Sequence, residues 1–354
     1  SITIINYCFN TLKLNKITLG VIEDNRNAVA LYKKMGFEID EIKTNAGVYN
    51  NKLCNALRMS LSYQKNKNLK LVLGTVQMGL AYGINNSKGQ VSEVESFKIL
   101  QHAFDNGIEM LDTAAVYGNA HEIIGRFHEK FPQKQFKIIT KLPSQINDTF
   151  AVTVNNYINE LRVDYLHTLL FHSFSSYQEN LKHFKTLKQL KSDKKIKHLG
   201  VSVYTNDEIK KVAENNDIDI IQLPFNLFDN LNLRGEAIAM AKAHGKTIHT
   251  RSALLQGLFF KDIHDSNPVV KKLNTELAEV VRLADEHKMP ISQLAINYCL
   301  QQKNIDNVLI GVDSLDQLKE NLTAVSCNLD SKIIDEINNI QIKDSNLLNP
   351  SLWN

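Results

Sequence analysis

Several features are scarce in this sequence of 354 residues, and each absence excludes a class of protein. Only four cysteines occur, widely spaced and without a Cys-x-x-Cys pair, which excludes a disulfide framework. No apolar run reaches the roughly 18 residues of a membrane span, and no charged-then-apolar leader opens the chain. We therefore expect reduced thiols, a cytoplasmic location, no membrane partner and no metal ion.

An excess of charge of one sign is also missing. The 41 basic and 38 acidic residues leave a formal charge of +3, and the one dense basic run, at 191–198, is typical of a solvated helix end. Nucleic acid is therefore not an expected partner. The apolar content of 43% and charged content of 22% are typical of a soluble globular protein with a packed core.

The chain is longer than one hydrophobic core usually serves, since domains average about 150 residues. A polar, lysine-rich stretch separates two apolar patterns at 62–68 and is interpreted as a linker. We predict an N-terminal segment at 1–61 and a larger domain at 69–354.

Beyond the linker, short apolar runs that contain β-branched residues alternate with stretches of helical spacing. Eight such runs predict strands, at 71–73, 108–111, 138–140, 166–171, 199–203, 218–223, 247–249 and 308–312. The first five recur at intervals of roughly 30 residues, the length of a strand and its crossover helix. The pattern predicts an α/β fold, a closed (β/α)8 TIM barrel.

Polar side chains stand where the early strands end, which is where active sites of such barrels lie. Asp112 ends the second strand, Tyr117 follows five residues later, Lys141 ends the third strand and His172 follows the fourth. A polar group there costs free energy unless it has a function. We interpret these four residues as one catalytic group.

Their order and spacing resemble the catalytic tetrad of the aldo-keto reductase family, over roughly residues 70–341. The resemblance implies an NAD(P)-dependent enzyme that reduces an aldehyde or ketone, including sugar-derived ones, to an alcohol. It implies that Tyr117 is the general acid, that Lys141 stabilises its phenolate, that Asp112 is the counter-charge of Lys141 and that His172 orients the carbonyl oxygen. The implied partner is a small carbonyl compound, and we expect a monomer or weak homo-oligomer.

The same resemblance implies a site for NADP or NAD along the later strands. Relatives hold the carboxamide with a Ser-Asn pair, but Val203 stands at the Asn position here, a loss of one hydrogen bond worth about 1 kcal/mol. The helix that follows the last strand offers unpaired amides to the phosphates. The expected cofactor-binding residues are Ser202, Gln222, Arg251, Ser252, Gly311, Asp313, Ser314, Gln317 and Asn321.

Two details of this site are predicted, each with an alternative. The stretch 311–318 has no Lys or Arg for the 2′-phosphate of NADPH but contains Asp313 and Asp316, so NADH should be accepted at least as well as NADPH. Lys319 or Arg251 could instead reach that phosphate. Arg251 is expected at the pyrophosphate, with a surface salt bridge as the alternative.

Local patterns add two expectations around the catalytic group. Asn119 and Glu122 predict a capping box that fixes the loop of Tyr117. The loops that should choose the substrate carry mainly apolar residues, which set the shape of a pocket. They are Met78, Leu80, Tyr82, Phe174, Phe225 and Leu255.

The N-terminal segment carries a second resemblance, to the C-terminal half of the GCN5-related (GNAT) N-acetyltransferase family. It rests on Asn25, Ala28, Leu31, Tyr32, Lys34, Gly36 and Phe37, after a strand at 17–22. The resemblance implies that Asn25 and Tyr32 lie beside acetyl-CoA. The family's pyrophosphate loop and first strands have no counterpart in this segment, so we expect a small α/β acetyltransferase-like remnant.

Two alternative functions stay open on the sequence alone. One is a non-catalytic, nicotinamide-binding regulatory barrel, which turnover of any aldehyde would exclude. The other is an acetyl-CoA-dependent N-acetyltransferase of an amino sugar in a full-length protein, which binding of acetyl-CoA would favour.

Overall fold

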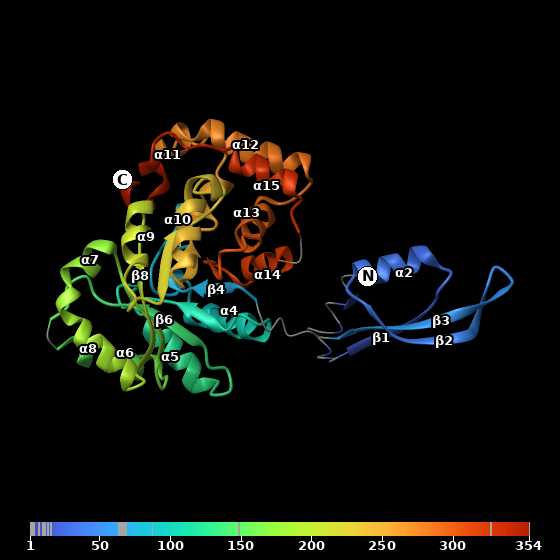
Figure 1. Ribbon diagram of the computed structural model, residues 1–354, viewed down its shortest axis with the longest axis horizontal. Helices are drawn as coiled ribbons and strands as arrows, with labels where there is room; N and C mark the ends of the chain where they lie inside the picture. Colours follow the sequence, from blue (N-terminus) through green and yellow to red (C-terminus); the bar gives the residue numbers. More distant parts are fainter. Residues whose placement is uncertain are drawn as a thin grey trace. The chain divides into compact units, whose positions relative to one another are not determined.

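The computed structural model divides the chain into two compact units, residues 1–67 and 68–354 (Figure 1). It describes residues 4, 5, 8, 12, 14, 16–62, 69–86, 88–147, 149–325 and 328–353. The predicted linker at 62–68 lies outside the described residues except for its first residue. No helix in these ranges is long and apolar enough to cross a membrane.

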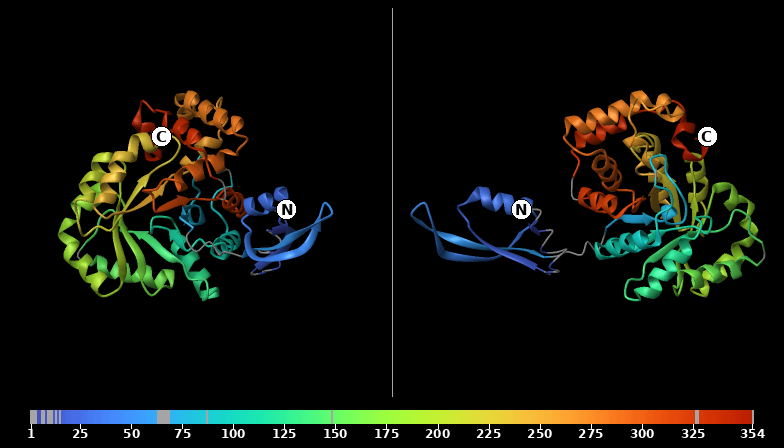
Figure 2. Two further views of the ribbon diagram at one scale, coloured as in Figure 1. Left: turned by 45° about the vertical axis from the view of Figure 1, so that its right-hand side comes forward. Right: turned by 180° about the vertical axis from the view of Figure 1, so that it is seen from behind.

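From residue 16 to residue 62, the N-terminal unit forms an antiparallel sheet with a helix on one face (Figure 2). Its strands are β1 (Lys16–Ile22), β2 (Glu38–Tyr49) and β3 (Lys52–Ser62), in the order β1-β3-β2, and the helix is α2 (Arg26–Lys34). A small core of Phe37, Leu57 and Met59 lies between the helix and the sheet. The side chain of Asn25 caps α2 by accepting from the amide of Ala28 at 3.3 Å.

Eight parallel strands form a closed barrel in the second unit, which confirms the predicted fold. Each predicted strand overlaps an observed one, in order β4 (Leu71–Gly74), β5 (Met110–Asp112), β6 (Lys137–Lys141), β7 (Leu166–Phe171), β8 (Ile196–Ser202), β9 (Ile220–Pro224), β10 (Thr247–Arg251) and β11 (Asn307–Ile310). The barrel closes where β11 pairs with β4, so the first and last strands of the unit are neighbours.

Helices surround this barrel on the outside (Figures 1 and 2). They are α3 (Val76–Gly79), α4 (Glu93–Asp105), α5 (Ala120–Lys130), α6 (Phe150–Leu161), α7 (Phe174–Glu179), α8 (Phe184–Ser192), α9 (Asn206–Ala213), α10 (Leu231–Ala243), α11 (Pro268–Lys272), α12 (Asn274–Glu286), α13 (Ile291–Leu300), α14 (Leu315–Ala324) and α15 (Ser331–Asn338). The long interval between β10 and β11 holds the 3-10 segment η3 (Leu255–Phe260) and helices α11 to α13.

The inside of the barrel is filled by an apolar layer of Val72, Ile139, Leu170 and Ile220. Side chains alternate along a strand, so residues two positions further toward the carboxyl end face the same interior. On these strands those positions are Gly74, Lys141, His172 and Gln222. The apolar layer is therefore the floor beneath the polar residues at the mouth of the barrel.

Candidate active site

The carboxyl ends of the strands surround a cavity of about 540 Å³, within the range of small-molecule sites. Of the residues expected at the site, all but one line it: Asp112, Tyr117, Lys141, His172, Ser202, Gln222, Arg251, Ser252, Gly311, Asp313, Gln317 and Asn321. The exception is Ser314, whose hydroxyl caps α14 by accepting from the amide of Gln317 at 3.3 Å. Ser314 thus fixes the start of the helix beside the cavity.

A buried ion pair lies at the centre of the candidate catalytic group, Asp112, Tyr117, Lys141 and His172. Lys141 Nζ is 2.5 Å from Asp112 Oδ1 and donates to the carbonyl of Thr113 at 2.9 Å, and both charged side chains are at most 5% exposed. Burial lowers the pKa of Lys141, but Asp112 and the Tyr117 phenol more than reverse this, so the pKa of Lys141 is raised. Lys141 is therefore a cation at neutral pH.

Tyr117 lies beside this cation, with Lys141 Nζ 5.0 Å from the centre of its ring. Its loop touches the backbone of Gly79, where a Cβ would lie 1.6 Å from the Tyr117 carbonyl oxygen. Gly118 next to it has a φ of +54° and meets the same backbone. These two glycines hold Tyr117 against the mouth of the barrel.

The predicted capping box after this loop is wrong. Asn119 precedes α5, but its side chain makes no capping hydrogen bond and accepts from Gln90 Nε2 at 2.7 Å instead. Glu122 pairs with Arg126 at 3.4 Å on the surface. The side chain of Asn119 thus bonds to Gln90 and not to the helix. Tyr117 is positioned by the close contact of its loop with Gly79, and no capping box contributes.

His172 completes the catalytic group as a neutral imidazole. Burial and the nearby cations Lys141 and Arg251 lower its pKa to about 4, against the opposing effect of Asp112. A neutral imidazole can donate a hydrogen bond to a carbonyl oxygen without giving up a positive charge.

Gln222, from β9, is hydrogen-bonded to Asp112 of the candidate catalytic group. Its Nε2 donates to Asp112 Oδ2 at 2.8 Å, so the two carboxylate oxygens of Asp112 hold Lys141 and Gln222 respectively. Asp112 therefore orients the amide of Gln222 as well as the ammonium of Lys141.

The side of the cavity at β11 and α14 has the features of a phosphate and ribose site. Gly311 lets Gln77 approach, since a Cβ would lie 2.6 Å from its Nε2. Gln77 Oε1 and Asp313 Oδ1 are buried without a hydrogen-bond partner among the described residues. Burial raises the pKa of Asp313, and the amide of Asp313 donates to Gln317 Oε1 at 2.7 Å. Unsatisfied polar atoms and a helix N-terminus fit a dinucleotide.

Sequence reasoning missed some lining residues and misplaced others. It missed Gly74, Thr75, Gln77, Asn85, Tyr204 and Ser292. Gly74 and Thr75 come at the end of the first barrel strand, and polar or small residues at strand ends are the signal that located the catalytic group on the next three strands. Of the six expected substrate-loop residues, Tyr82 and Leu255 line the cavity, whereas Met78, Leu80, Phe174 and Phe225 do not. Phe225 stacks on Tyr298 inside the core, with ring centres 5.5 Å apart.

No cluster of three or more His, Cys, Asp or Glu side chains suited to a metal ion occurs among the residues that the structure describes.

Comparison with known proteins gives two family matches. The model described as the aldo/keto reductase family matches residues 70–342, and the model described as an acetyltransferase (GNAT) domain matches residues 1–56. Both agree with the resemblances seen in the sequence.

Individual relatives are distant. The chain is 23% identical to the NADH-specific methylglyoxal reductase of Escherichia coli, over 63% of this chain and 80% of that protein. It is 25% identical to the L-galactose dehydrogenase of Arabidopsis thaliana, over 74% and 89%, and 26% identical to the D-arabinose 1-dehydrogenase of Saccharomyces cerevisiae, over 62% and 73%.

A similar solved structure is an aldo-keto reductase of Bacillus halodurans in its holo form. It superimposes with a TM-score of 0.62 at 17% identity and covers 86% of this chain and 96% of that one. This likeness establishes the barrel fold.

Proposed function

Since the chain belongs to the aldo/keto reductase family, we propose that its barrel reduces a small aldehyde or ketone to an alcohol with Tyr117 as the general acid. The family makes the barrel an NAD(P)-dependent oxidoreductase. The observation that carries the proposal is the buried cation Lys141, held by Asp112 beside Tyr117 at the mouth of the cavity.

Several residues would hold the cofactor. Ser202 and Gln222 line the cavity, Gln222 beside Asp112, and would hold the carboxamide of a nicotinamide. Gly311, Gln317 and the N-terminus of α14 suit the phosphates. Asp313 and Asn321 are suited to the adenosine. A bound reduced nicotinamide supplies the hydride that the carbonyl carbon receives.

The chain's own residues then handle the proton and the developing charge. The Tyr117 hydroxyl donates its proton to the carbonyl oxygen as that oxygen becomes negative, and the O–H bond of the alcohol forms as the phenol O–H bond breaks. Lys141 stabilises the resulting phenolate, which takes a proton back from solvent. Neutral His172 donates to the carbonyl oxygen and fixes its position.

For the substrate we propose small carbonyl compounds, including those derived from sugars. The support is the names of three relatives, which concern methylglyoxal, L-galactose and D-arabinose. NADH should be accepted at least as well as NADPH, because the carboxylates of Asp313 and Glu320 line the cavity near α14.

The proposal is tested by NADH and NADPH oxidation with a panel of aldehydes, ketones and sugars. Lys141→Met removes the cation that stabilises the phenolate, and we expect the reduction rate to fall by about 100-fold or more. Lys185→Met, which changes an exposed lysine of α8 that does not line the cavity, is the matched control. No turnover of any carbonyl by the wild type, or full activity in Lys141→Met, would contradict the proposal.

A further inference from the structure

Arg251 is a cation of the cavity whose charge is not paired within the part of the chain that the structure describes. It ends β10 and lines the cavity, and no carboxylate in the described part of the chain forms an ion pair with it. Its guanidinium carbon lies 4.1 Å from the centre of the Tyr204 ring, and Nη2 donates to the carbonyl of Val203 at 3.4 Å. Stacking uses the face of the guanidinium, so the remaining N–H groups at its edge stay available for an anion.

The guanidinium is directed toward the catalytic side of the cavity. Tyr204 and Val203 follow β8, which β9 separates from β10, whereas the expected phosphate site follows β11 on the other side of β10. Arg251 therefore reaches across β9, away from Gly311 and α14. It is also close enough to His172 to contribute to the lowered pKa of that imidazole, after burial and Lys141.

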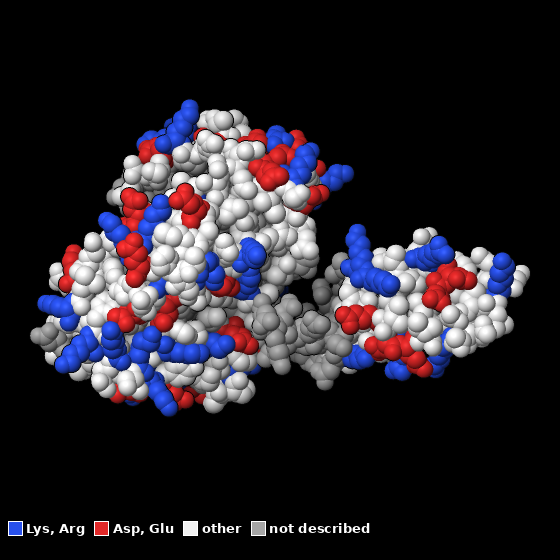
Figure 3. Space-filling view, viewed as in Figure 1, with Lys and Arg blue, Asp and Glu red and all other residues white. Residues whose placement is uncertain are grey.

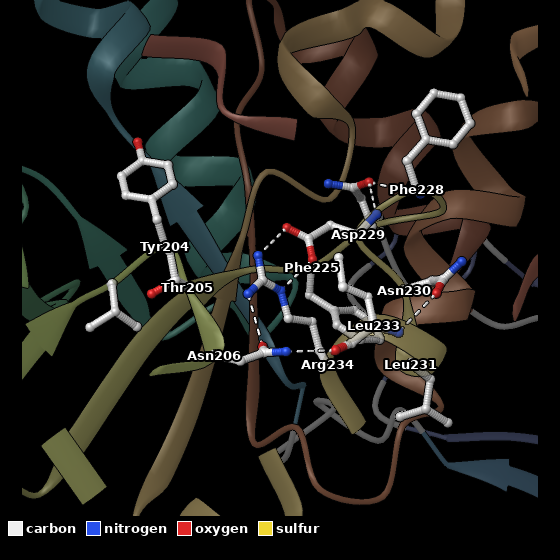
Figure 4. Close-up of polar contacts among 12 residues, drawn as sticks. Tyr204, Thr205, Asn206, Phe225, Phe228, Asp229, Asn230, Leu231, Leu233 and Arg234 are labelled. Carbon is white, nitrogen blue, oxygen red and sulfur yellow. Dashed lines mark hydrogen bonds and ion pairs between the residues drawn. The ribbon is translucent and has the colours of Figure 1, made fainter. Parts of the chain in front are cut away.

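Asp229, a candidate counter-charge for Arg251, is already bound to another arginine. Asp229 is fully buried and binds both Nε and Nη2 of Arg234. Figure 4 shows Arg234 between Asp229 and Asn206, whose Oδ1 accepts from its Nη1 at 3.0 Å. Asp229 is therefore paired with Arg234 in this network. Arg251 is near enough to oppose the rise that burial causes in the pKa of Asp229, but it forms no ion pair with that carboxylate.

The platform under Arg251 is rigidly built. The amide of Tyr204 donates to Glu208 Oε2 at 2.7 Å, and Thr205 and Glu208 form a complete capping box at the start of α9. Asn206, the first residue of that helix, is held by Arg234. The loop that carries Tyr204 is thus hydrogen-bonded at Tyr204, Thr205 and Asn206, and it offers a defined surface for the guanidinium.

We propose that Arg251 binds a carboxylate of the substrate, so that the enzyme acts on carbonyl compounds that carry an acidic group. The planar guanidinium matches a carboxylate through two parallel hydrogen bonds. The inference rests on the proposed reductase function and specifies its substrate class. It assigns to Arg251 a role at the substrate in place of the pyrophosphate contact expected from the sequence.

The test compares aldehydes that differ only in charge. Glyoxylate, 4-oxobutanoate and 4-formylbenzoate are each paired with their methyl ester, because the three place the carboxylate at different distances from the carbonyl. For at least one pair the wild type should have a kcat/KM for the acid about tenfold or more above that for the ester. Arg251→Leu should reduce this ratio to about one. Arg251→Lys keeps the positive charge but cannot form two parallel hydrogen bonds, so it should give an intermediate ratio.

Two controls distinguish a substrate contact of Arg251 from a cofactor contact. Arg126→Leu changes an arginine on α5 that does not line the cavity and should keep the wild-type ratio. The affinity for NADH is measured in each variant by fluorescence. If Arg251→Leu weakens NADH about tenfold and leaves the acid-to-ester ratio unchanged, Arg251 binds the cofactor and the inference fails. The absence of acid preference in every wild-type pair would also overturn it.

Failure of the reductase function gives a different result. In that case neither acids, esters nor neutral ketones are reduced, and calorimetric binding of 4-oxobutanoate and its methyl ester to the wild type and to Arg251→Leu decides the role of Arg251. Preferential binding of the acid that Arg251→Leu abolishes would support the inference, and equal binding would reject it. If Arg251→Leu does not fold, Arg251→Gln replaces it in each comparison.

Discussion

At the scale of single residues, Asp112 joins the polar side chains at the mouth of the barrel. Its two carboxylate oxygens accept hydrogen bonds from Lys141 at 2.5 Å and from Gln222 at 2.8 Å. Its position at the end of an apolar strand made it predictable from the sequence, and the same holds for Lys141 and His172. Tyr204 was not predictable in this way. Its role depends on stacking with Arg251, and the paths of two separate loops decide that contact.

The choice of dinucleotide is a residue-scale prediction that centres on Asp313. This half-buried carboxylate lines the cavity, whereas Asp316 does not line it and pairs with Lys319 at 3.0 Å. NADPH should bind no more tightly than NADH, since the 2′-phosphate would be placed near a carboxylate. Asp313→Arg should shift the ratio of affinities toward NADPH by about tenfold or more.

Fluorescence titration of both cofactors measures this ratio, and Asp316→Arg is the control with the same charge change outside the cavity. Wild-type protein that binds NADPH more than about tenfold more tightly than NADH would reject the prediction.

At the scale of elements, the sequence pattern located all eight barrel strands because short apolar runs with β-branched residues reflect burial directly. It was wrong on the capping box at Asn119, since Gln90, in the loop between α3 and α4, donates to that side chain. The observed strand ends also differ from the predicted ends by one or two residues, for example at β5 and β11. Pairing and loop contacts decide these ends, and neither depends on local sequence alone.

The network that joins the β8–α9 and β9–α10 loops gives the prediction at this scale (Figure 4). The side chains of Asp229 and Arg234 are 0% and 7% exposed, so removal of one leaves an uncompensated buried charge. Asp229→Ala should lower the free energy of unfolding by about 3 to 5 kcal/mol. The double variant Asp229→Leu with Arg234→Met should lose less than the two single variants together.

Urea unfolding followed by circular dichroism measures these free energies. A loss below about 1 kcal/mol for Asp229→Ala would show that the pair is not a structural support.

At the scale of the whole molecule, two compact units share one chain, and each has its own hydrophobic core. Basic and acidic side chains are interspersed on the face of the barrel unit drawn in Figure 3, in keeping with the small net charge. The N-terminal unit matches an acetyltransferase (GNAT) domain, and its described residues include three strands and the helix α2. Asn25, which the resemblance places beside acetyl-CoA, caps α2 in this structure. The sequence led us to predict two units because a polar stretch separates two apolar patterns, and the structure divides the chain after residue 67.

We predict that the barrel is independent of the N-terminal unit. A protein without residues 1–66 should fold and keep a kcat within about twofold of the full chain, because the barrel is closed and its core is complete without them. Thermal melting and steady-state kinetics of both proteins provide the check. Aggregation of the shortened protein, or loss of its cooperative melt, would show that the barrel depends on the N-terminal unit.

The role of Tyr117 as the general acid is tested most directly by the rate of hydride transfer in Tyr117→Phe, measured in single turnover with saturating reduced cofactor. We predict a rate about 100-fold or more below the wild type with unchanged cofactor affinity, because the proton donor is lost while the cofactor contacts stay. Tyr82→Phe, which alters another tyrosine of the same cavity, should lose less than about tenfold. A loss below about tenfold in Tyr117→Phe would contradict the assignment of Tyr117 as the acid.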